Sequence, residues 1–331
     1  MSAKLFLFIF ANGFHRPICQ PAYMEFISHN FCVGKTSGKT SVLHVDFDCI
    51  ILDAWSAKLL LNEIFSLYYG KDVKFPRISF MNYMRLKTDK GDLEAEEYWK
   101  EKVKNMPSFP KLNYQKKFAE VQNVRFDRIE CDFSFIETQR LYQKIKNYHF
   151  TPAAVISTIF MKTLAQYSET PGLSINVTLF NRQLLHEDVN GILGEFTNNA
   201  VISYQEKTDS LLDAIRATQE QMWRLVQYRK FEGSNILKML SSGRAGKAIM
   251  PVVFTCMLEG NVSKVTKKRY SFKEEYAISQ TPQVVLDHHV RDDLGYLKIS
   301  WDYIIDIFDK QYITDIFGAY VNNIKKFMEK Y

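Results

Sequence analysis

The chain has 331 residues, a hydrophobic share of 46% and a formal net charge of +6. This length and hydrophobicity allow a large buried core, so we expect one large or two medium globular domains. Lys and Arg are nearly balanced by Asp and Glu, and the densest basic runs, 267–269 and 325–326, are short. Neither nucleic acid nor a membrane surface is therefore an expected partner.

The cysteines and the start of the chain favour a reducing compartment. The five cysteines lie at positions 19, 32, 49, 131 and 256, without metal-type spacing, and their odd number argues against a disulfide framework. The start, MSAKLFLFIFANG, lacks a small-residue cleavage site, and no apolar stretch is long enough to cross a bilayer. We expect a cytoplasmic protein.

The first part of the chain alternates a strand with a helix. Residues 41–48, SVLHVDFD, alternate as a strand does, and residues 54–70 form an amphipathic helix that ends at Gly70. Residues 70–135 are rich in charge and proline and contain an extended connector, MPSFPKL.

The second part begins with a buried helix. Thr151 is its expected N-cap, Pro152 its first residue, and the side chains that follow are apolar almost all round. The alternation of strands and helices predicts an α/β or α+β fold. Further strands are expected at 173–181, 250–258, 282–290 and 296–302, with helices near 209–230 and 311–330.

The acidic residues between the first strand and the first helix have two interpretations. Asp53 directly precedes the helix, where a carboxylate accepts the free N–H groups of the first turn, with Ser56 three residues on. Alternatively His44, Asp46 and Asp48 project from one face of the strand as metal ligands. Acids at strand ends usually face water, and no second histidine cluster completes a ligand set, so we predict no metal.

The motif Asp48-x4-Asp53-x2-Ser56 resembles the D-x-x-x-x-D-x-x-S signature of the heterocyclization domains, or cyclization-type condensation domains, of nonribosomal peptide synthetases. Seven further segments resemble segments of that family in the same order, and the resemblance runs from about residue 40 to the C-terminus. They are YWKEKVKNMPSFPKL (98–112), TPAAVISTIFMKTLAQYS (151–168), NVTLFNR (176–182), GEFT (194–197), PVVFT (251–255), SQTPQVVLD (279–287) and WD (301–302).

The resemblance implies a fold of two chloramphenicol-acetyltransferase-like lobes, each an α/β (α+β) two-layer sandwich, arranged in a V. It places a partial N-terminal lobe with connector at 39–148 and a C-terminal lobe at 149–331, and leaves 1–38 unassigned. Family members carry a further stretch before the Asp48 loop, and nothing in 1–35 resembles it. We therefore expect an N-terminally truncated domain with an incomplete first lobe, whose activity is an open question.

The resemblance also implies a function in secondary metabolism, such as siderophore synthesis. Such a domain joins a carrier-bound acyl or peptidyl thioester to carrier-bound Cys, Ser or Thr, and then removes water to form a thiazoline or oxazoline. The substrates are attached to the phosphopantetheine arms of upstream and downstream peptidyl or aryl carrier proteins. The resemblance also implies an adenylation domain nearby and no directly bound cofactor. The alternatives are a stand-alone acyltransferase of the same superfamily, or an inactive or docking remnant.

Site residues in the first loop follow from the family pattern. Ordinary condensation domains carry H-H-x-x-x-D-G there, with a histidine placed to assist amine attack. Here Asp48 and Cys49 occupy the histidine positions. The resemblance predicts an ion pair between Asp53 and Arg182, next to Asn181, that braces the loop. Asp48 either braces this loop or polarises a reacting group.

A second set of predicted site residues lies near the C-terminus. Thr255 and Asp287 stand where the family's proposed cyclodehydration pair lies. From the residues alone they are a β-branched strand residue and a strand end. The resemblance favours Asp287 as acid and base, Thr255 as its hydrogen-bonding partner and Gln283 as a group that positions substrate.

Three other features of the sequence bear on its chemistry. His288, His289 and Asp293 repeat the H-H-x-x-x-D spacing, but Leu294 replaces the glycine, so surface histidines at a strand end are expected. Neither Cys49 nor Cys256 has a histidine partner in sequence, which argues against a cysteine nucleophile. Two residues depart from the family pattern, since Cys256 stands where serine is usual and Glu195 replaces aspartate. Neither departure removes a proposed catalytic group.

Overall fold

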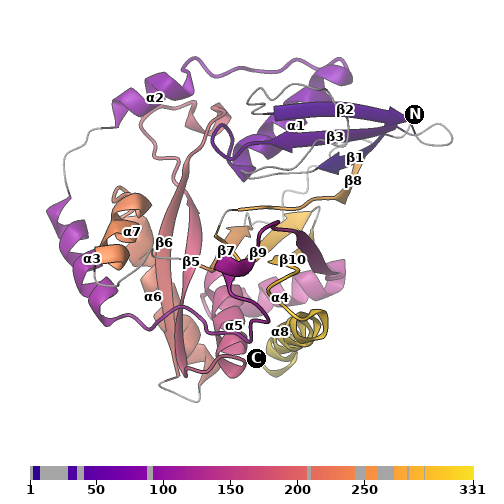
Figure 1. The fold of residues 1–331 in the computed structure, drawn as a ribbon. Coiled ribbons are helices and arrows are strands. Elements are labelled where there is room, and N and C mark those ends of the chain that lie inside the picture. Colours follow the sequence, from indigo (N-terminus) through magenta and orange to yellow (C-terminus); the bar gives the residue numbers. More distant parts are fainter. Residues whose placement is uncertain are drawn as a thin grey trace. The chain divides into compact units, whose positions relative to one another are not determined.

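The computed structural model describes residues 3–7, 29–35, 41–87, 92–206, 210–242, 250–258, 272–281, 283–293 and 295–331. The chain forms two compact units (Figure 1). Unit 1 comprises Met1–Gly91, Phe180–Thr197 and Lys268–Pro282, and unit 2 comprises Asp92–Leu179, Asn198–Lys267 and Gln283–Tyr331.

Unit 1 is built on a four-stranded sheet. Strand β1 lies parallel to β3 and to β8, and β2 lies antiparallel to β3. The sheet order is β2 (His29–Lys35), β3 (Ser41–Phe47), β1 (Ala3–Leu7) and β8 (Phe272–Tyr276).

Helix α1 (Ala54–Tyr68) follows β3 as the sequence predicts. Alternation along β3 buries Val45 and Phe47, and they form a core with Leu61 and Phe65 of α1. The helix ends at Gly70, whose φ of 68° is the left-handed conformation that glycine adopts without strain.

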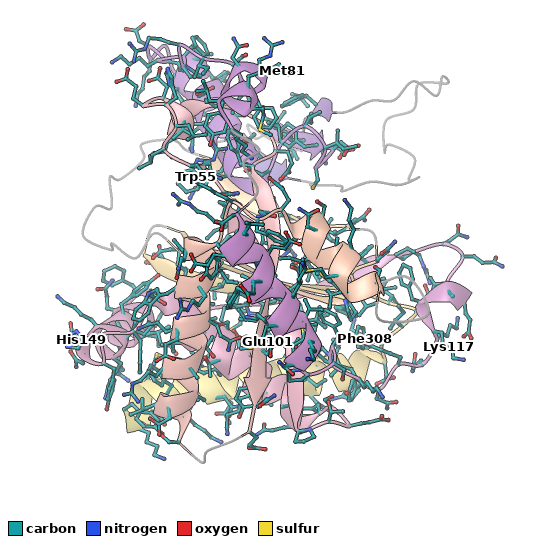
Figure 2. All side chains as sticks on the ribbon, turned by 90° about the vertical axis from the view of Figure 1, so that its left-hand side faces the viewer. Trp55, Met81, Glu101, Lys117, His149 and Phe308 are labelled. Carbon is teal, nitrogen blue, oxygen red and sulfur yellow. The ribbon has the colours of Figure 1, made fainter. Side chains whose placement is uncertain are left out.

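A second, smaller core in unit 1 surrounds helix α2 (Phe80–Leu86). Tyr83 is fully buried against Val189, Ile192 and Phe196, and its hydroxyl donates to the Gln183 carbonyl at 2.9 Å. Met81 lies on the same short helix but is 64% exposed (Figure 2). The segment 180–197, which includes the short helix η2 (Val189–Gly191), therefore packs with unit 1.

Unit 2 contains a six-stranded mixed sheet. Strand β7 runs parallel to β5 and β9, and β10 runs antiparallel to β9 and β4. The order is β4 (Phe126–Asp132), β10 (Tyr296–Ile304), β9 (Leu286–Asp293), β7 (Val252–Met257), β5 (Gly172–Phe180) and β6 (Thr197–Gln205). The predicted combination of helices with a mixed sheet is thus present.

Helices of unit 2 pack against one another around a single hydrophobic core. Helix α5 contacts α4, α6 and α8, and α3 contacts α7 (Figure 1). As predicted, Thr151 caps α5, Pro152 is its first residue and the helix is buried nearly all round. The helices are α3 (Leu93–Asn105), α4 (Phe135–Asn147), α5 (Pro152–Gln166), α6 (Leu211–Gln227), α7 (Gly233–Ser242) and α8 (Lys310–Lys330), with a short η1 (Phe118–Glu120).

The units do not divide at the boundary that the sequence predicts. The sequence places one boundary at residue 148, whereas residues 92–148 belong to unit 2. The reason is packing, because β4 pairs with β10 along its whole length and Trp99 and Leu141 lie in the core of unit 2. Within the described residues, no helix is both long and apolar enough to cross a bilayer.

Candidate functional site

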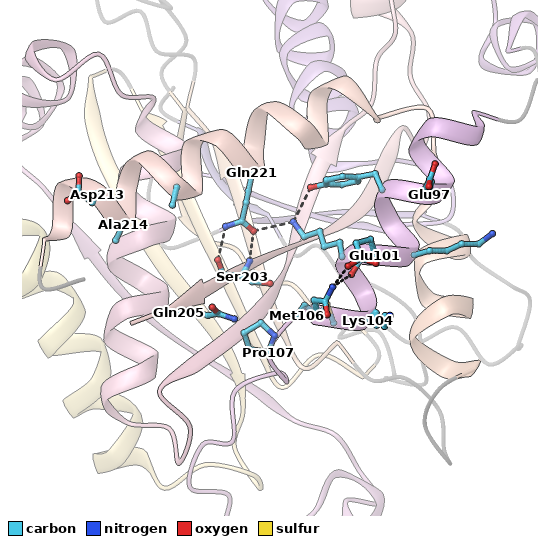
Figure 3. Close-up of a pocket in the computed structure, with 15 residues that line it drawn as sticks. Glu97, Glu101, Lys104, Met106, Pro107, Ser203, Gln205, Asp213, Ala214 and Gln221 are labelled. Atoms are coloured by element: carbon cyan, nitrogen blue, oxygen red, sulfur yellow. Dashed lines mark hydrogen bonds between the residues drawn. The ribbon is translucent and has the colours of Figure 1, made fainter. Parts of the chain in front are cut away.

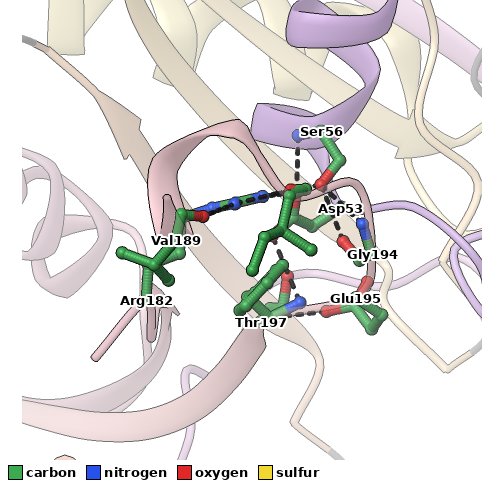
Figure 4. A network of polar contacts seen from close by, with 9 residues as sticks. Asp53, Ser56, Arg182, Val189, Gly194, Glu195 and Thr197 are labelled. Carbon is green, nitrogen blue, oxygen red and sulfur yellow. Dashed lines mark hydrogen bonds and ion pairs between the residues drawn. The ribbon is translucent and has the colours of Figure 1, made fainter. Parts of the chain in front are cut away.

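Asp53 is the centre of a buried polar network in unit 1 (Figure 4). As N-cap of α1, its Oδ1 accepts the backbone N–H of Ser56 at 2.6 Å, and its Oδ2 accepts that of Phe196 at 3.2 Å. The predicted ion pair is present, with Arg182 Nη2 3.4 Å from Asp53 Oδ1. Both carboxylate oxygens are therefore engaged by the fold.

Arg182 links this network to the segment that precedes β6. Its Nη2 donates to Ser56 Oγ at 2.6 Å, and its Nη1 donates to the carbonyls of Val189 and Ile192, each at 2.8 Å. The guanidinium lies 3.9 Å from the centre of the Phe196 ring, a distance typical of a cation–π contact. A planar fork with several donors suits this role better than a lysine would.

Ser56 closes the network. Its Oγ donates to the Gly194 carbonyl at 2.7 Å and accepts the Gly194 N–H at 3.1 Å. Gly194 and Glu195 belong to the GEFT segment, and Asn181 donates its backbone N–H to Phe196 at 3.0 Å. Burial raises the pKa of Glu195, and the hydrogen bond from the Thr197 N–H opposes that shift. All of these residues lie in unit 1, so the motif residues mainly brace one another.

Asp48 lies outside this network. Its Oδ1 accepts the backbone N–H of Ile50 at 2.9 Å, which closes the turn that follows β3. His44 and Asp46 share one face of β3, as alternation predicts. Across the described part of the chain, no group of three or more His, Cys, Asp or Glu side chains is arranged to hold a metal ion.

Unit 2 carries a polar face on its sheet, opposite the face that packs into the hydrophobic core. Strand register sets these side chains in two rows. The first row contains Asn176, Val253, Asp287, Asp302 and Arg128, and the second contains Thr178, Thr255, His289, Ser300 and Glu130.

Asp287 lies in the middle of the first row and is 3% exposed. Its Oδ1 is buried and has no hydrogen-bond partner among the described residues. Its Oδ2 lies 3.3 Å from His289 Nε2. A buried carboxylate oxygen without a donor is costly, so this oxygen is the atom of the site that most needs an external partner.

Asp302 is the second carboxylate of this row, and Arg128 holds it. Arg128 Nε and Nη2 donate to its two oxygens at 2.6 Å and 2.7 Å, a bidentate geometry. Burial acts to raise the pKa of Asp302, but Arg128 and His289 outweigh burial and lower it. Asp302 is therefore a structural anion.

His289 and His288 differ sharply, and the expectation of surface histidines is wrong for both. His289 Nε2 lies between Asp287 Oδ2, at 3.3 Å, and Asp302 Oδ2, at 3.6 Å. Burial alone would lower the pKa of His289, but the two carboxylates raise it to about 9. His288 is fully buried in the opposite face, 2.8 Å from the Tyr320 hydroxyl, and burial lowers its pKa well below the usual value. They lie inside β9, and the accompanying Leu294 lies outside the described residues.

Thr255 lies on the same face but does not bond to Asp287 as the family pattern predicts. Its Oγ1 donates to Thr178 Oγ1 at 3.0 Å. The parallel register explains this difference, because Val253 stands opposite Asp287 and Thr255 stands opposite His289. The order of strands, which the sequence does not reveal, decides this neighbour.

Gln283 and Cys256 complete the set of predicted residues. Gln283 is exposed, in the turn before β9, and its φ of 67° is unusual for a residue other than glycine. Burial raises the pKa of Cys256 to about 11, so its thiol is protonated at neutral pH. That agrees with the expectation that this cysteine is no nucleophile.

A groove of about 1050 Å³ lies elsewhere in unit 2, between α3, α6 and β6 (Figure 3). Gln221 pairs with the backbone of Ser203 through both its amide atoms, at 2.8 Å and 2.9 Å, and accepts from Lys102 Nζ at 3.2 Å. Among the described residues no carboxylate lies within ion-pair distance of Lys102. Burial lowers the pKa of Lys102 to about 8.

Comparison with known proteins finds a family model and several relatives that cover most of this chain. The family model described as "Condensation domain" matches residues 30–331. The chain is 27% identical to bacitracin synthase 1 of Bacillus licheniformis, covering 87% of this chain and 6% of that protein. It is 27% identical to the phenyloxazoline synthase MbtB of Mycobacterium bovis, covering 87% of this chain and 21% of that protein. The chain therefore spans only a small part of these relatives.

Solved structures share the fold. The cyclization-docking bidomain of the synthetase EpoB from Sorangium cellulosum superimposes with a TM-score of 0.79 over 99% of this chain and 70% of that chain, at 22% identity. At this identity the likeness concerns the fold alone.

We predict that Arg182 and Asp53 stabilise unit 1 as a coupled pair. Arg182→Met should lower the free energy of unfolding by about 3–5 kcal/mol, because it leaves a buried carboxylate without its cation. Asp53→Asn should also destabilise, and the double variant should lose less than the sum of the two. Urea denaturation measures the free energy of unfolding of all three variants.

Arg77→Met is the control, since Arg77 pairs with Glu187 and Asp188 but is 68% exposed. This substitution should lower the free energy of unfolding by under about 1 kcal/mol. Additive losses for Asp53 and Arg182 would contradict the coupling.

We also predict that Lys102 destabilises unit 2 at neutral pH. Its pKa is about 8 in the folded chain against an ordinary value of 10.5, so unfolding takes up a proton between these values and stability rises with pH across that window. Lys102→Met should raise the free energy of unfolding by about 1–2 kcal/mol at pH 7, and the gain should shrink towards pH 10.5. Lys104→Met, on the exposed side of the same helix, is the control in urea titrations. Equal effects of the two variants would show that burial of Lys102 costs nothing.

Proposed function

The chain belongs to the condensation-domain family, and from this premise we propose that it joins two carrier-bound substrates and then closes a five-membered heterocycle. Condensation domains are acyltransferases that act on thioesters held by carrier proteins. The proposed substrates are an acyl or peptidyl thioester and a carrier-bound Cys, Ser or Thr, delivered on phosphopantetheine arms by neighbouring carrier proteins. The products are a thiazoline or an oxazoline. A cytoplasmic location and a nearby adenylation domain stay predictions.

The observation that carries this proposal is the contrast between two buried carboxylates. Asp53, in the motif loop, has both oxygens engaged by backbone donors or by Arg182. Asp287 has one oxygen beside His289 and one without a hydrogen-bond partner in the described structure. Of the two, Asp287 is the group with an oxygen that no hydrogen bond from the described residues engages. This supports Asp53 as an architectural residue and Asp287 as the acid and base.

The two steps of the reaction make different demands. In the first, the acceptor amine attacks the thioester carbonyl, an amide forms and the donor phosphopantetheine thiol leaves. In the second, the acceptor's thiol or hydroxyl attacks the new amide carbonyl, and Asp287 takes its proton. Asp287 returns this proton to the oxyanion, which becomes a hydroxyl group. Asp287 then takes the proton that the nitrogen releases and passes it to that hydroxyl, which leaves as water as the C=N bond forms. A single carboxylate that alternately accepts and donates a proton is therefore sufficient for the second step.

The remaining predicted residues have supporting roles in this proposal. Thr255 lies beside His289 on the same polar face and can hydrogen-bond the tetrahedral intermediate. Gln283 is exposed in the turn that leads into β9, four residues before Asp287, and is proposed to position substrate. Asp48 holds its own turn through Ile50, which favours bracing over polarising a substrate.

Two relatives favour ring closure over simple amide formation. One relative is named a phenyloxazoline synthase, and a solved structure with the same fold is named a cyclization-docking bidomain. The loop after β3 carries Asp48 and Cys49 in place of the histidines of ordinary condensation domains. The acid–base residue of the reaction is therefore expected elsewhere in the chain.

We predict that Asp287→Asn separates the two steps. The variant should form the acyclic amide while heterocycle formation falls at least about 100-fold, as expected on loss of a general acid–base group. Donor-loaded and cysteine-loaded carrier proteins, followed by mass spectrometry, distinguish the products by one water. Asp292→Asn is a matched control, because Asp292 is also an aspartate of β9 but is engaged by the Tyr142 hydroxyl. Undiminished ring formation by Asp287→Asn would contradict the mechanism. An acyclic product from the unaltered chain would identify a plain acyltransferase.

A further inference from the structure

We propose that His289, as an imidazolium, is a positioning residue that pairs with one oxygen of Asp287 and leaves the other oxygen for the substrate, an inference that rests on the proposed role of Asp287. His289 lies two residues after Asp287 on β9, so strand alternation puts both side chains on the polar face of the sheet. Its Nε2 lies 3.3 Å from Asp287 Oδ2, within ion-pair distance but outside hydrogen-bond geometry, and Oδ1 has no hydrogen-bond partner among the described residues. The imidazole charge therefore lies nearer to Oδ2 than a substrate at Oδ1 would.

Charge balance on the polar face requires the histidine proton. Asp287 and Asp302 are two anions in one row, and Arg128 is committed to Asp302 by its bidentate contact. Without a proton on His289, this group of four side chains holds two negative charges against one positive charge while almost fully buried. An uncompensated charge in such a place is expensive, so the cluster favours the protonated form of His289.

The neighbouring strands present neutral side chains or a lysine that is already paired. On β7 and β5 the adjacent side chains are the neutral Thr255 and Thr178. On β10 and β4, Lys298 is paired with Glu130 at 3.1 Å. Arg291 continues the same face of β9, opposite Lys298 in register. His289 is the cation whose ring lies within ion-pair distance of Asp287, at 3.3 Å.

The electrostatics agree with this geometry. Burial lowers the pKa of His289, yet the carboxylates of Asp287 and Asp302 together raise it to about 9. The ring is therefore protonated throughout the neutral range. Because the pKa in the folded chain lies above the ordinary 6.5, this pairing stabilises the fold fully below pH 6.5 and is lost as the pH rises through 9.

The inference also accounts for the position of Thr255. Register places Thr255 opposite His289, one row from Asp287. A hydroxyl there can contact a reacting group that lies against Asp287 Oδ1, on the other side of the carboxylate from His289, which lies 3.3 Å from Oδ2. His289 in this scheme touches no reacting atom. It acts through Asp287 alone.

His289→Gln tests the role because glutamine keeps a hydrogen-bond donor and removes the charge. The rate of ring closure is measured from pH 5.5 to 9.5 with loaded carrier proteins, alongside the rate of amide formation. The acidic limb of the ring-closure profile should move up by about one pH unit or more, with partial recovery of rate at high pH and unchanged amide formation. His186→Gln is the control, since its ring lies 4.0 Å from Asp188 in a more exposed segment.

The outcomes separate this inference from the proposed function. If Asp287→Asn abolishes ring closure while His289→Gln keeps the unaltered pH profile, His289 has no positioning role and the proposed function stands. If Asp287→Asn closes rings normally, the proposed function fails, whatever His289→Gln does. A shifted profile in His289→Gln with loss of ring closure in Asp287→Asn supports both.

A measurement without turnover covers the case in which His289→Gln does not fold. In the unaltered chain with isotope-labelled histidines, NMR titration should show one imidazole with a pKa near 9. The pKa of that imidazole should fall by at least about one unit in Asp287→Asn, because this substitution keeps the histidine and neutralises its partner. A chain in which no histidine titrates above pH 8, or in which Asp287→Asn leaves the titration unchanged, would overturn the proposal.

Discussion

Alternation of side chains along the central strands of unit 2 is the constraint on which its core and its candidate site both depend. Leu286, His288 and Val290 of β9 face the hydrophobic core, so Asp287 and His289 must face the opposite way. A slip of one residue in register would bury the acid among apolar side chains and expose the core residues. Because Trp301 of β10 is fully buried in the same core, that register is strongly fixed. The position of Asp287 is therefore set by hydrophobic packing.

The two units use buried carboxylates in different ways. In unit 1 the Asp53 side chain is engaged by two backbone N–H groups and Arg182, so its burial stabilises the junction of α1 with the segment 180–197. In unit 2 the cluster of Asp287, Asp302, His289 and Arg128 is balanced in charge, but one oxygen of Asp287 lacks a donor among the described residues. In a structural network the lone pairs of a buried carboxylate accept hydrogen bonds from the protein, whereas a carboxylate that exchanges protons with a substrate needs a lone pair that no protein donor engages.

Much of the local structure could be predicted from the sequence, because caps and periodicity are local signals. The N-caps Asp53 and Thr151 and the buried helix α5 are present as the pattern predicts. Strand β4 is not predicted, since four residues of its FDRIECD sequence are charged and the strand lies in a segment rich in proline and charge. Its place beside β10, 174 residues away for the Arg128–Asp302 pair, depends on packing that no local pattern encodes. The charged surroundings of His289 stay hidden for the same reason.

Two adjacent histidines show how far environment outweighs sequence. His288 and His289 are chemically identical neighbours, yet alternation sends one into an aromatic core beside Tyr320 and the other between two carboxylates. Burial without a counter-charge keeps the first neutral, while two anions keep the second protonated. The H-H-x-x-x-D spacing at this strand therefore cannot act as the histidine pair of a condensation loop, because its two rings lie on opposite faces of a sheet. The same alternation that excludes this role is what brings His289 to Asp287.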